Sequence, residues 1–266
     1  MTTAAANTAF AHPGRLLEGK SAFVTGGGSG IGRAGAMAMA RQGARVIITD
    51  RDGDKAASVA EDLAREGRSA TSRTLDVTDD GAIAVAIEEA IRDLGRLDIL
   101  HSHAGYQAEG SLESVSLEGM DLSWQLNVRS HFIAARAVVG HMKARGGGSV
   151  IITASNSGVQ YDREMIAYAT TKHAVVAMTR QMAADYARYN VRFNALCPGF
   201  IDTPFNAGFE KQMGGRAGLE TYISSNIPLG RWGTVDEIAD AVLFLASDMS
   251  SFMTGHALVV DGGESI

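Results

Sequence analysis

The chain contains little cysteine and little proline. Cys197 is the single cysteine among 266 residues, which excludes a disulfide framework and a zinc site built from several cysteines. Four prolines stand against 31 glycines, a balance that suits tight turns between strands and helices better than disorder. These shortages indicate a folded protein of a reducing compartment, and we expect a cytoplasmic location.

An excess of positive charge and a long apolar run are also missing. The formal net charge is −6 without a cluster of Lys and Arg, so no nucleic acid is expected as a partner. No uncharged apolar run approaches the ~18–20 residues that span a bilayer. The segment before Arg15 lacks the basic and leucine-rich character of a secretory signal. We therefore expect no membrane partner, and a flexible arm over residues 1–18.

What the chain does have is an alternation of short apolar runs and longer helical patterns. Near-continuous apolar strands separated by helices indicate a parallel sheet covered on both faces. We therefore predict a single-domain Rossmann-type α/β fold over residues 19–266, with a doubly wound parallel sheet of about seven strands. The predicted strands are residues 21–25, 44–49, 69–77, 97–100, 149–153, 191–196 and 257–260, and the predicted helices 31–42, 52–66, 79–94, 119–144, 167–189 and 234–247.

Residues 198–233 break this alternation, because they connect a strand to a helix with no strand between them. Connections longer than ~12–15 residues are usually functional or disordered. This one is too apolar for a solvated linker, with Phe200, Phe205, Phe209, Met213 and Tyr222. We expect short helices here that form a substrate lid around residues 203–230.

A glycine-rich turn follows the first predicted strand and opens the first predicted helix. Glycine permits close backbone approach, and a helix N-terminus offers N–H groups to a pyrophosphate. The spacing fits T-G-x-x-x-G-x-G through Thr25, Gly26, Gly30 and Gly32. A G-x-G-x-x-G pattern also exists, but its last glycine, Gly35, falls inside the helix. The turn predicts a dinucleotide site, with a purely structural turn as the alternative.

Asp50 ends the second predicted strand, eighteen positions after Gly32. An acidic residue there accepts hydrogen bonds from the adenosine ribose hydroxyls and repels a 2′-phosphate, so it favours NAD over NADP. Arg51 weakens this preference because an arginine neutralises a phosphate, whereas Ser29 offers no such charge. The alternative role for Asp50 is a helix N-cap, which Asp52 fills at least as well.

Tyr168 and Lys172 lie four positions apart in the sequence YATTK, so they share one face of a predicted helix. An isolated pair of this kind is more often plain helix surface. Ser155 changes that reading, because it lies at the carboxyl end of a strand, where a ligand binds in such folds. A cation about 4 Å from a phenol contributes on the order of 4 kcal/mol. We therefore expect a lowered pKa for Tyr168, with burial opposing the shift, and proton transfer to or from an alcohol.

Together these motifs resemble the short-chain dehydrogenase/reductase family over about residues 20–263. The resemblance rests on Asn127, on Ser155 and on the segments TGGGSGIG, TDRD, LDV, HAG, YATTK, CPGFIDT and TGHALVVDGG. The Ser155-to-Tyr168 separation of thirteen matches the family and selects Ser155 over Ser157.

The resemblance implies roles for single residues. Tyr168 is the acid/base, Lys172 lowers its pKa and holds the nicotinamide ribose, and Ser155 orients the substrate oxygen. Asn127 holds a water that links Lys172 to solvent. The implied NAD site consists of Gly26, Ser29, Gly30, Ile31, Asp50, Arg51, Asp76, Val77, His103, Ala104, Gly105, Tyr168, Lys172, Pro198, Gly199, Ile201 and Thr203.

The chain departs from the family at Ser102 and His103, where members usually carry two asparagines. Serine and histidine still form hydrogen bonds, so we expect cofactor binding to survive, with a titratable group near the cofactor. His101 and His103 face the same way on a strand, but no third ligand is near, so no metal is expected. We expect Cys197 to be a packed residue rather than a nucleophile, since no partner base is evident.

The sequence therefore predicts an NAD-dependent oxidoreductase that transfers a hydride between NAD(H) and a secondary alcohol or ketone. A non-catalytic dinucleotide-binding scaffold and an isomerase with the same apparatus are the alternatives. The expected substrate contacts are Ser155, Ser157, Tyr161, Tyr168 and Phe205, and further candidate pocket walls are residues 159–166, Tyr106, Gln107 and residues 204–225.

The resemblance also implies a homotetramer built through two long helices. Small residues form stripes on both helices, and core packing explains such stripes equally well. The stripes are Ala134, Ala135, Val138 and Val139, and Ala174, Val175, Val176 and Met178.

Overall fold

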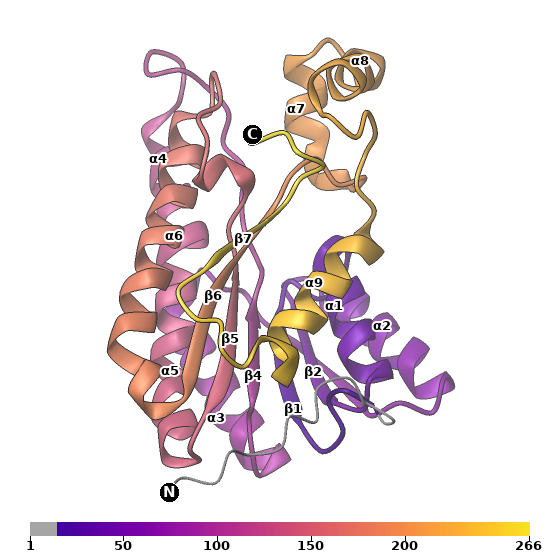
Figure 1. The fold of residues 1–266 in the computed structure, drawn as a ribbon, viewed down its shortest axis with the longest axis vertical. Helices are drawn as coiled ribbons and strands as arrows, with labels where there is room; N and C mark the ends of the chain where they lie inside the picture. Colours follow the sequence, from indigo (N-terminus) through magenta and orange to yellow (C-terminus); the bar gives the residue numbers. More distant parts are fainter. Residues whose placement is uncertain (1–14) are drawn as a thin grey trace, which may run out of the picture.

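A parallel sheet forms the centre of the molecule, whose residues 15–266 are described by a computed structural model (Figure 1). The strands are β1 (Ser21–Thr25), β2 (Arg45–Asp50), β3 (Ala70–Thr74), β4 (Ile99–Ser102), β5 (Gly148–Thr153), β6 (Val191–Pro198) and β7 (Ala257–Val260). All neighbours pair in parallel, in the order β3-β2-β1-β4-β5-β6-β7. This order is that of a doubly wound Rossmann-type sheet, and the predicted fold is confirmed.

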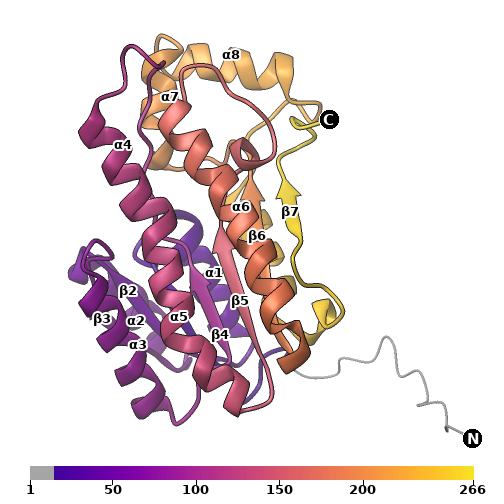
Figure 2. The ribbon, with the colours of Figure 1, turned by 90° about the vertical axis from the view of Figure 1, so that its left-hand side faces the viewer.

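Helices cover both faces of the sheet (Figures 1 and 2). One face packs against α1 (Gly30–Arg41), α2 (Gly53–Arg65) and α9 (Val235–Ala246), and the other against α3 (Asp80–Leu94), α5 (Ser130–Ala144) and α6 (Ile166–Tyr186). Successive residues of a strand serve opposite cores: Phe23 of β1 lies in the core with α3, α5 and α6, whereas Ala22 and Val24 lie in the other. Burial on both faces explains the near-continuous apolar strands.

The helix expected over residues 119–144 is not uniform. It begins as α4 (Leu117–Trp124), passes through the π-helical turn η1 (Gln125–Arg129) and continues as α5. The expected helical stretch is therefore confirmed, and the π turn within it is an additional feature. A π turn is a local change of hydrogen-bond pattern, often at functional sites, that an apolar repeat does not reveal. The turn carries Asn127, which is fully buried.

The N-terminal boundary of the domain lies earlier than expected. Residues 15–18 form a turn in which Leu17 is fully buried. The Leu17 N–H donates to the carbonyl of Gln42 at 2.9 Å, so this part of the predicted flexible arm is wrong. The rest of the predicted arm, residues 1–14, lies outside the described residues.

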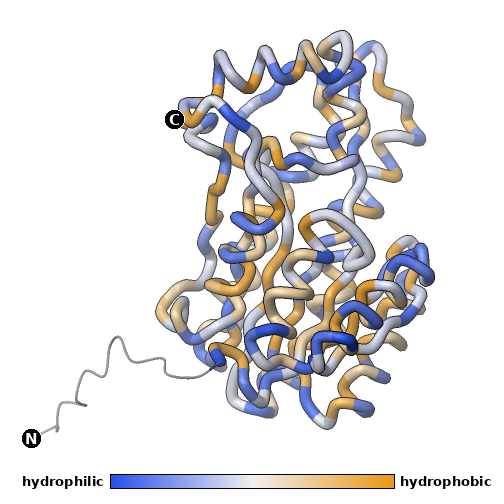
Figure 3. Tube along the Cα trace, turned by 90° about the vertical axis from the view of Figure 1, so that its right-hand side faces the viewer, coloured by the Kyte–Doolittle hydropathy of each residue, from blue (hydrophilic) through white to orange (hydrophobic). Residues whose placement is uncertain are grey.

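The expected short helices are present in the long connection after β6. They are η4 (Pro204–Asn206), α7 (Ala207–Gln212) and α8 (Arg216–Asn226). Figure 1 shows α7 and α8 at the upper right, above α9 and α1, and Figure 3 shows hydrophobic positions distributed along this segment as well as through the body. Leu219, Ile223 and Ile227 form a small core of their own against Phe200 and other aromatic side chains. We call residues 203–230 the lid.

The remaining helical turns are short: η2 (Asn156–Gly158), η3 (Ala187–Tyr189) and η5 (Asp248–Ser250). Within the described part of the chain, no helix has both the length and the apolar character that a bilayer crossing requires.

Candidate active site

A cavity of about 980 Å³ lies where the strands end, beneath the lid. The residues that follow β1, β2, β4, β5 and β6 line it, together with residues of α7 and α8. All seventeen residues of the expected dinucleotide site line this cavity, and so do Ser155, Ser157, Tyr161, Tyr168 and Phe205. Gln107 was wrongly expected in its wall: its amide is buried and has no hydrogen-bond partner.

The turn after β1 requires glycine for its shape. Gly26 has φ +66°, and a Cβ there would lie 3.0 Å from the Ala104 Cα. A Cβ on Gly32 would lie 2.1 Å from the Gly26 carbonyl oxygen. Helix α1 begins at Gly30, and the side chain of its N-cap, Ser29, accepts no hydrogen bond from the helix. The first N–H groups of α1 are thus left for a ligand in the cavity, as a dinucleotide phosphate site requires.

The Asp50 carboxylate is held in place by the backbone. Its two oxygens accept from Gly28 N–H and Asp52 N–H, each at 3.0 Å. Asp52 caps α2 by accepting from Lys55 N–H at 3.2 Å, so Asp50 is not the N-cap. Since Asp50 lines the cavity, its charge faces any ligand that binds beside the glycine turn.

Arg51 and Asp76 both line the cavity and are close enough for their charges to interact. Hydrogen bonds from the Thr78 N–H and hydroxyl lower the pKa of Asp76, and the Arg51 charge lowers it further. The positive charge of Arg51 is therefore partly balanced by a neighbouring carboxylate.

Tyr168 and Lys172 lie on α6 and are both buried, with 5% and 2% exposure. The Lys172 Nζ lies 5.4 Å from the Tyr168 ring centroid and donates to the Thr153 carbonyl at 3.1 Å. Ser155 lies at the end of β5 as the N-cap of η2 and lines the cavity together with both. The structure thus brings these three side chains together.

The pKa of Tyr168 is raised to about 12 rather than lowered. Burial is the main cause, and a hydrogen bond with Ser155 opposes it only in part. Burial also lowers the pKa of Lys172 to about 8. The expectation that the neighbouring ammonium outweighs burial was therefore wrong, because both groups are removed from water together.

Comparison with known proteins identifies the family of this chain. Residues 26–265 match the family model described as Enoyl-(Acyl carrier protein) reductase. The chain belongs to the short-chain dehydrogenase/reductase family. It is similar to 2-keto-3-deoxy-L-fuconate dehydrogenase of Xanthomonas campestris, at 38% identity over 95% of this chain and 82% of that protein. Gluconate 5-dehydrogenase of Gluconobacter oxydans is 34% identical over 94% of this chain and 96% of its own length.

A solved structure shows the same fold. Gluconate 5-dehydrogenase from Burkholderia cenocepacia, in complex with NADP and tartrate, matches with a TM-score of 0.88 at 36% identity. The match covers 94% of this chain and 97% of that chain. This short-chain dehydrogenase/reductase is therefore an oxidoreductase that acts on alcohol or ketone groups.

The side chain of Asn127 does not reach the cavity. Its Nδ2 donates to the Tyr106 carbonyl at 2.8 Å and to the Thr171 hydroxyl at 3.0 Å, and its Oδ1 accepts from Tyr106 N–H at 2.7 Å. The side chain therefore ties the loop after β4 to α6. The water relay implied by the family resemblance stays a prediction.

The histidine that replaces a family asparagine is part of a buried network. His103 Nδ1 lies 3.1 Å from the Thr153 hydroxyl, and His101 Nε2 lies 3.0 Å from the same hydroxyl. The backbone carbonyl of Thr153 accepts a hydrogen bond from Lys172. Burial, with a smaller effect of the Lys172 charge, lowers the pKa of His103 to about 4, so its ring is neutral near pH 7. His103 also donates its backbone N–H to the Thr25 hydroxyl at 2.9 Å. The substitution thus keeps hydrogen bonding without adding charge.

Two other candidate chemistries can be compared with the structure. Within residues 15–266, no three His, Cys, Asp or Glu side chains are placed to hold a metal ion. Cys197 is fully buried, and burial raises the pKa of its thiol to about 12, so it is a packed residue, as expected.

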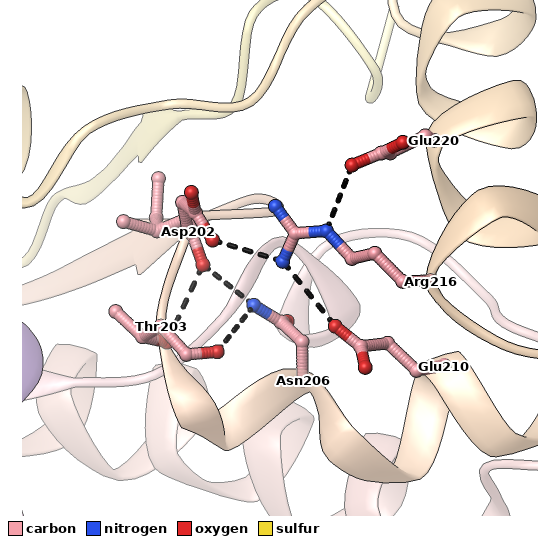
Figure 4. Close-up of polar contacts among 7 residues, drawn as sticks. Asp202, Thr203, Asn206, Glu210, Arg216 and Glu220 are labelled. Atoms are coloured by element: carbon pink, nitrogen blue, oxygen red, sulfur yellow. Dashed lines mark hydrogen bonds and ion pairs between the residues drawn. The ribbon is translucent and has the colours of Figure 1, made fainter.

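One arginine links residues within the lid to one another and to the residue just before it (Figure 4). Arg216, at the start of α8, pairs with Asp202 before the lid at 2.9 Å, and with Glu210 of α7 at 3.3 Å. Its Nε pairs with Glu220 at 2.9 Å, and its guanidinium lies 4.2 Å from the Trp232 ring centroid. These charged contacts therefore brace the lid internally and at its two ends, largely outside the hydrophobic core.

Sequence reasoning missed one charged residue of the cavity, Glu264, and assigned no role to Asn156. Both line the cavity, and they are hydrogen-bonded to each other at 2.9 Å. The available signal was the segment after the last strand, Asp261-Gly262-Gly263, because glycines there turn the chain at the edge of the sheet where ligands bind.

Proposed function

We propose that this enzyme is an NAD-dependent dehydrogenase of secondary alcohols, or a reductase of the corresponding ketones, with Ser155, Tyr168 and Lys172 as its catalytic residues. The observation that carries the proposal is the convergence of these three buried side chains on one cavity. The same cavity is lined by Asp50 and by the glycine turn, so reacting groups and a dinucleotide share one space.

A nicotinamide dinucleotide fits the residues that are present. The uncapped N-terminus of α1 suits the pyrophosphate, and the Asp50 carboxylate suits the ribose hydroxyls of the adenosine. The bound dinucleotide supplies the carbon that accepts or donates the hydride. The name of the Burkholderia relative mentions NADP, which makes NADP the alternative. NAD is favoured here because the anchored Asp50 repels a 2′-phosphate, and because Arg51 is partly balanced by Asp76.

The protein residues perform the proton transfer. During oxidation, Tyr168 takes the hydroxyl proton of the alcohol, and the Ser155 hydroxyl donates a hydrogen bond to the same substrate oxygen. Lys172 stabilises the phenolate that Tyr168 needs for this step, and its bond to the Thr153 carbonyl fixes its position. The proposed water on Asn127 would use the backbone, since the amide side chain is occupied. Reduction reverses each step.

The homotetramer and the cytoplasmic location remain predictions. Ala134, Ala135 and Val138 of the expected interface stripe are core residues, so these three do not argue for subunit contact. Trp124 and Phe132 support contact better, because they are exposed at 43% and 45% on adjoining helices. Light scattering coupled to size exclusion tests the tetramer, and a monomeric mass would contradict it.

A substrate panel tests the proposed function. We expect NADH to accumulate when secondary alcohols are added with NAD, with much slower turnover with NADP. Product that forms with no net change in NADH absorbance would support the isomerase. A chain that binds NAD but turns over no alcohol or ketone would support the scaffold alternative.

A further inference from the structure

The end of the chain is folded back into the active-site cavity. After β7, the Asp261 carboxylate accepts from Gly263 N–H and Ser265 N–H, each at 2.9 Å. Gly262 and Gly263 have φ +70° and +91°, which favours glycine at both positions. This turn presents Glu264 to the cavity that Tyr168 and Lys172 also line.

Both oxygens of the Glu264 carboxylate are engaged by neutral donors. Asn156 Nδ2 donates to one oxygen at 2.9 Å, and the Tyr222 hydroxyl of α8 donates to the other at 3.1 Å. Asn156 in turn accepts from the Ser155 hydroxyl at 3.2 Å. Glu264 therefore lies two hydrogen bonds away from the residue that faces the substrate oxygen.

The charge of Glu264 is not neutralised by the protein. Among residues 15–266, no Lys or Arg forms an ion pair with it. Burial is the main cause that raises its pKa to about 7, and the Asp162 and Asp261 carboxylates add to the effect, while the bonds from Tyr222 and Asn156 oppose it. A carboxylate offers about four lone-pair positions, so further donors can bind it.

We propose that Glu264 is a specificity-determining residue, which selects alcohols and ketones that carry a second hydrogen-bond donor, either a hydroxyl or an ammonium group. The inference rests on the proposed dehydrogenase function. A hydrogen-bond donor on the substrate binds favourably to the Glu264 carboxylate, which has no cationic partner. A carboxylate on the substrate is instead repelled by the negative charge of Glu264. Arg163 also lines the cavity and is the nearest alternative, since it would favour a carboxylate substrate.

Cyclohexanol derivatives of similar size provide the test. With the full chain and NAD, we would measure kcat/KM for cyclohexanol, a cyclohexanediol, an aminocyclohexanol and a hydroxycyclohexanecarboxylate. We expect wild type to prefer the diol and the amino alcohol to cyclohexanol by about tenfold or more, as a charged hydrogen bond implies. In Glu264→Gln this preference for the diol and the amino alcohol over cyclohexanol should fall close to one.

Two variants serve as controls. Glu61→Gln removes an exposed carboxylate on α2, away from the cavity, and should keep the wild-type preference. Tyr222→Phe keeps Glu264 but removes one of its donors, so the Glu264 pKa should rise. The preference for the amino alcohol should increase as the pH rises through about 7 in wild type. The same increase in preference should occur at a higher pH in Tyr222→Phe. In Glu264→Gln the preference should not change with pH.

The outcomes separate this inference from the proposed function. Turnover of all alcohols with the same preference in wild type and Glu264→Gln would overturn the role of Glu264 and leave the dehydrogenase standing. Fastest turnover of the carboxylate substrate would do the same and favour Arg163. If wild type oxidised none of the alcohols and reduced none of the matching ketones, the dehydrogenase itself would be contradicted, and the inference with it.

Discussion

The Lys172 ammonium lies 5.4 Å from the Tyr168 ring centroid, and both side chains are almost completely removed from water. Burial raises the pKa of Tyr168 to about 12 and lowers that of Lys172 to about 8. Near neutral pH the pair therefore carries a protonated phenol next to an ammonium. Burial of the Lys172 ammonium lowers the stability of the folded protein. The charge can therefore be detected by measuring stability against pH.

The first prediction concerns stability against pH. The folded-state pKa of Lys172, about 8, lies below its ordinary value of 10.5, so the unfolded chain binds more protons between these values. Stability should therefore rise with pH from about 8 to 10 relative to Lys172→Met, by up to ~3 kcal/mol. Urea unfolding at several pH values measures this. If the free energies of unfolding of wild type and Lys172→Met changed with pH in the same way, the burial of the Lys172 ammonium would be contradicted.

Asp50 should control cofactor choice. Asp50→Asn removes the charge that repels a 2′-phosphate, so the ratio of kcat/KM for NAD over NADP should fall by about tenfold or more. Asp54→Asn removes a carboxylate from the first turn of α2 and should leave that ratio unchanged. Fluorescence titration with the two oxidised nucleotides supplies an independent binding measurement. An unchanged ratio in Asp50→Asn would count against the NAD assignment.

Asn127 should contribute to stability as well as to activity. Asn127→Ala removes the hydrogen-bond partners of the Tyr106 N–H and C=O at a partly buried site. An orphaned buried group costs about 1–3 kcal/mol, and water relieves part of that cost here, so the free energy of unfolding should fall by about 1–2 kcal/mol. Urea titration of the variant checks this. If Asn127→Ala unfolds like wild type but loses activity, the side chain acts only in the reaction.

The lid should depend on Arg216. Its ion pairs with Asp202, Glu210 and Glu220 are solvent-exposed, so salt weakens them. Arg216→Ala should raise KM for the alcohol several-fold with little change in kcat, because the lid closes the cavity rather than performing the chemistry.

Salt separates this role from a general loss of fold. KM should increase with ionic strength in wild type but not in Arg216→Ala. Arg65→Ala breaks an exposed pair with Asp62 on α2 and serves as the matched control. A salt-independent KM in wild type would contradict a lid whose shape depends on these ion pairs.

The sequence predicted the strands and most helices because burial on both faces leaves near-continuous apolar runs. The family resemblance implied most of the residues that line the cavity, and the fold brings them together because parallel strands end at one edge of the sheet. The sequence did not predict the π turn at Asn127, because the hydrogen-bond pattern of a π turn does not alter the spacing of apolar residues in the sequence. The direction of the Tyr168 pKa shift was not predicted, because it depends on how deeply the phenol is buried and on its distance from the Lys172 ammonium. Glu264 was missed because its place depends on a three-residue turn.

Tyr168→Phe is the most direct test of the central claim, that a buried phenol transfers the substrate proton. Loss of this group should lower kcat for alcohol oxidation by ~10³-fold or more, while NAD still binds with wild-type affinity. Tyr189→Phe, outside the cavity, should retain wild-type activity. In a single-turnover experiment, we predict that NADH formation by Tyr168→Phe is slowed by the same ~10³-fold or more, with unchanged NAD binding. NADH formation within tenfold of the wild-type rate in that variant would contradict the account.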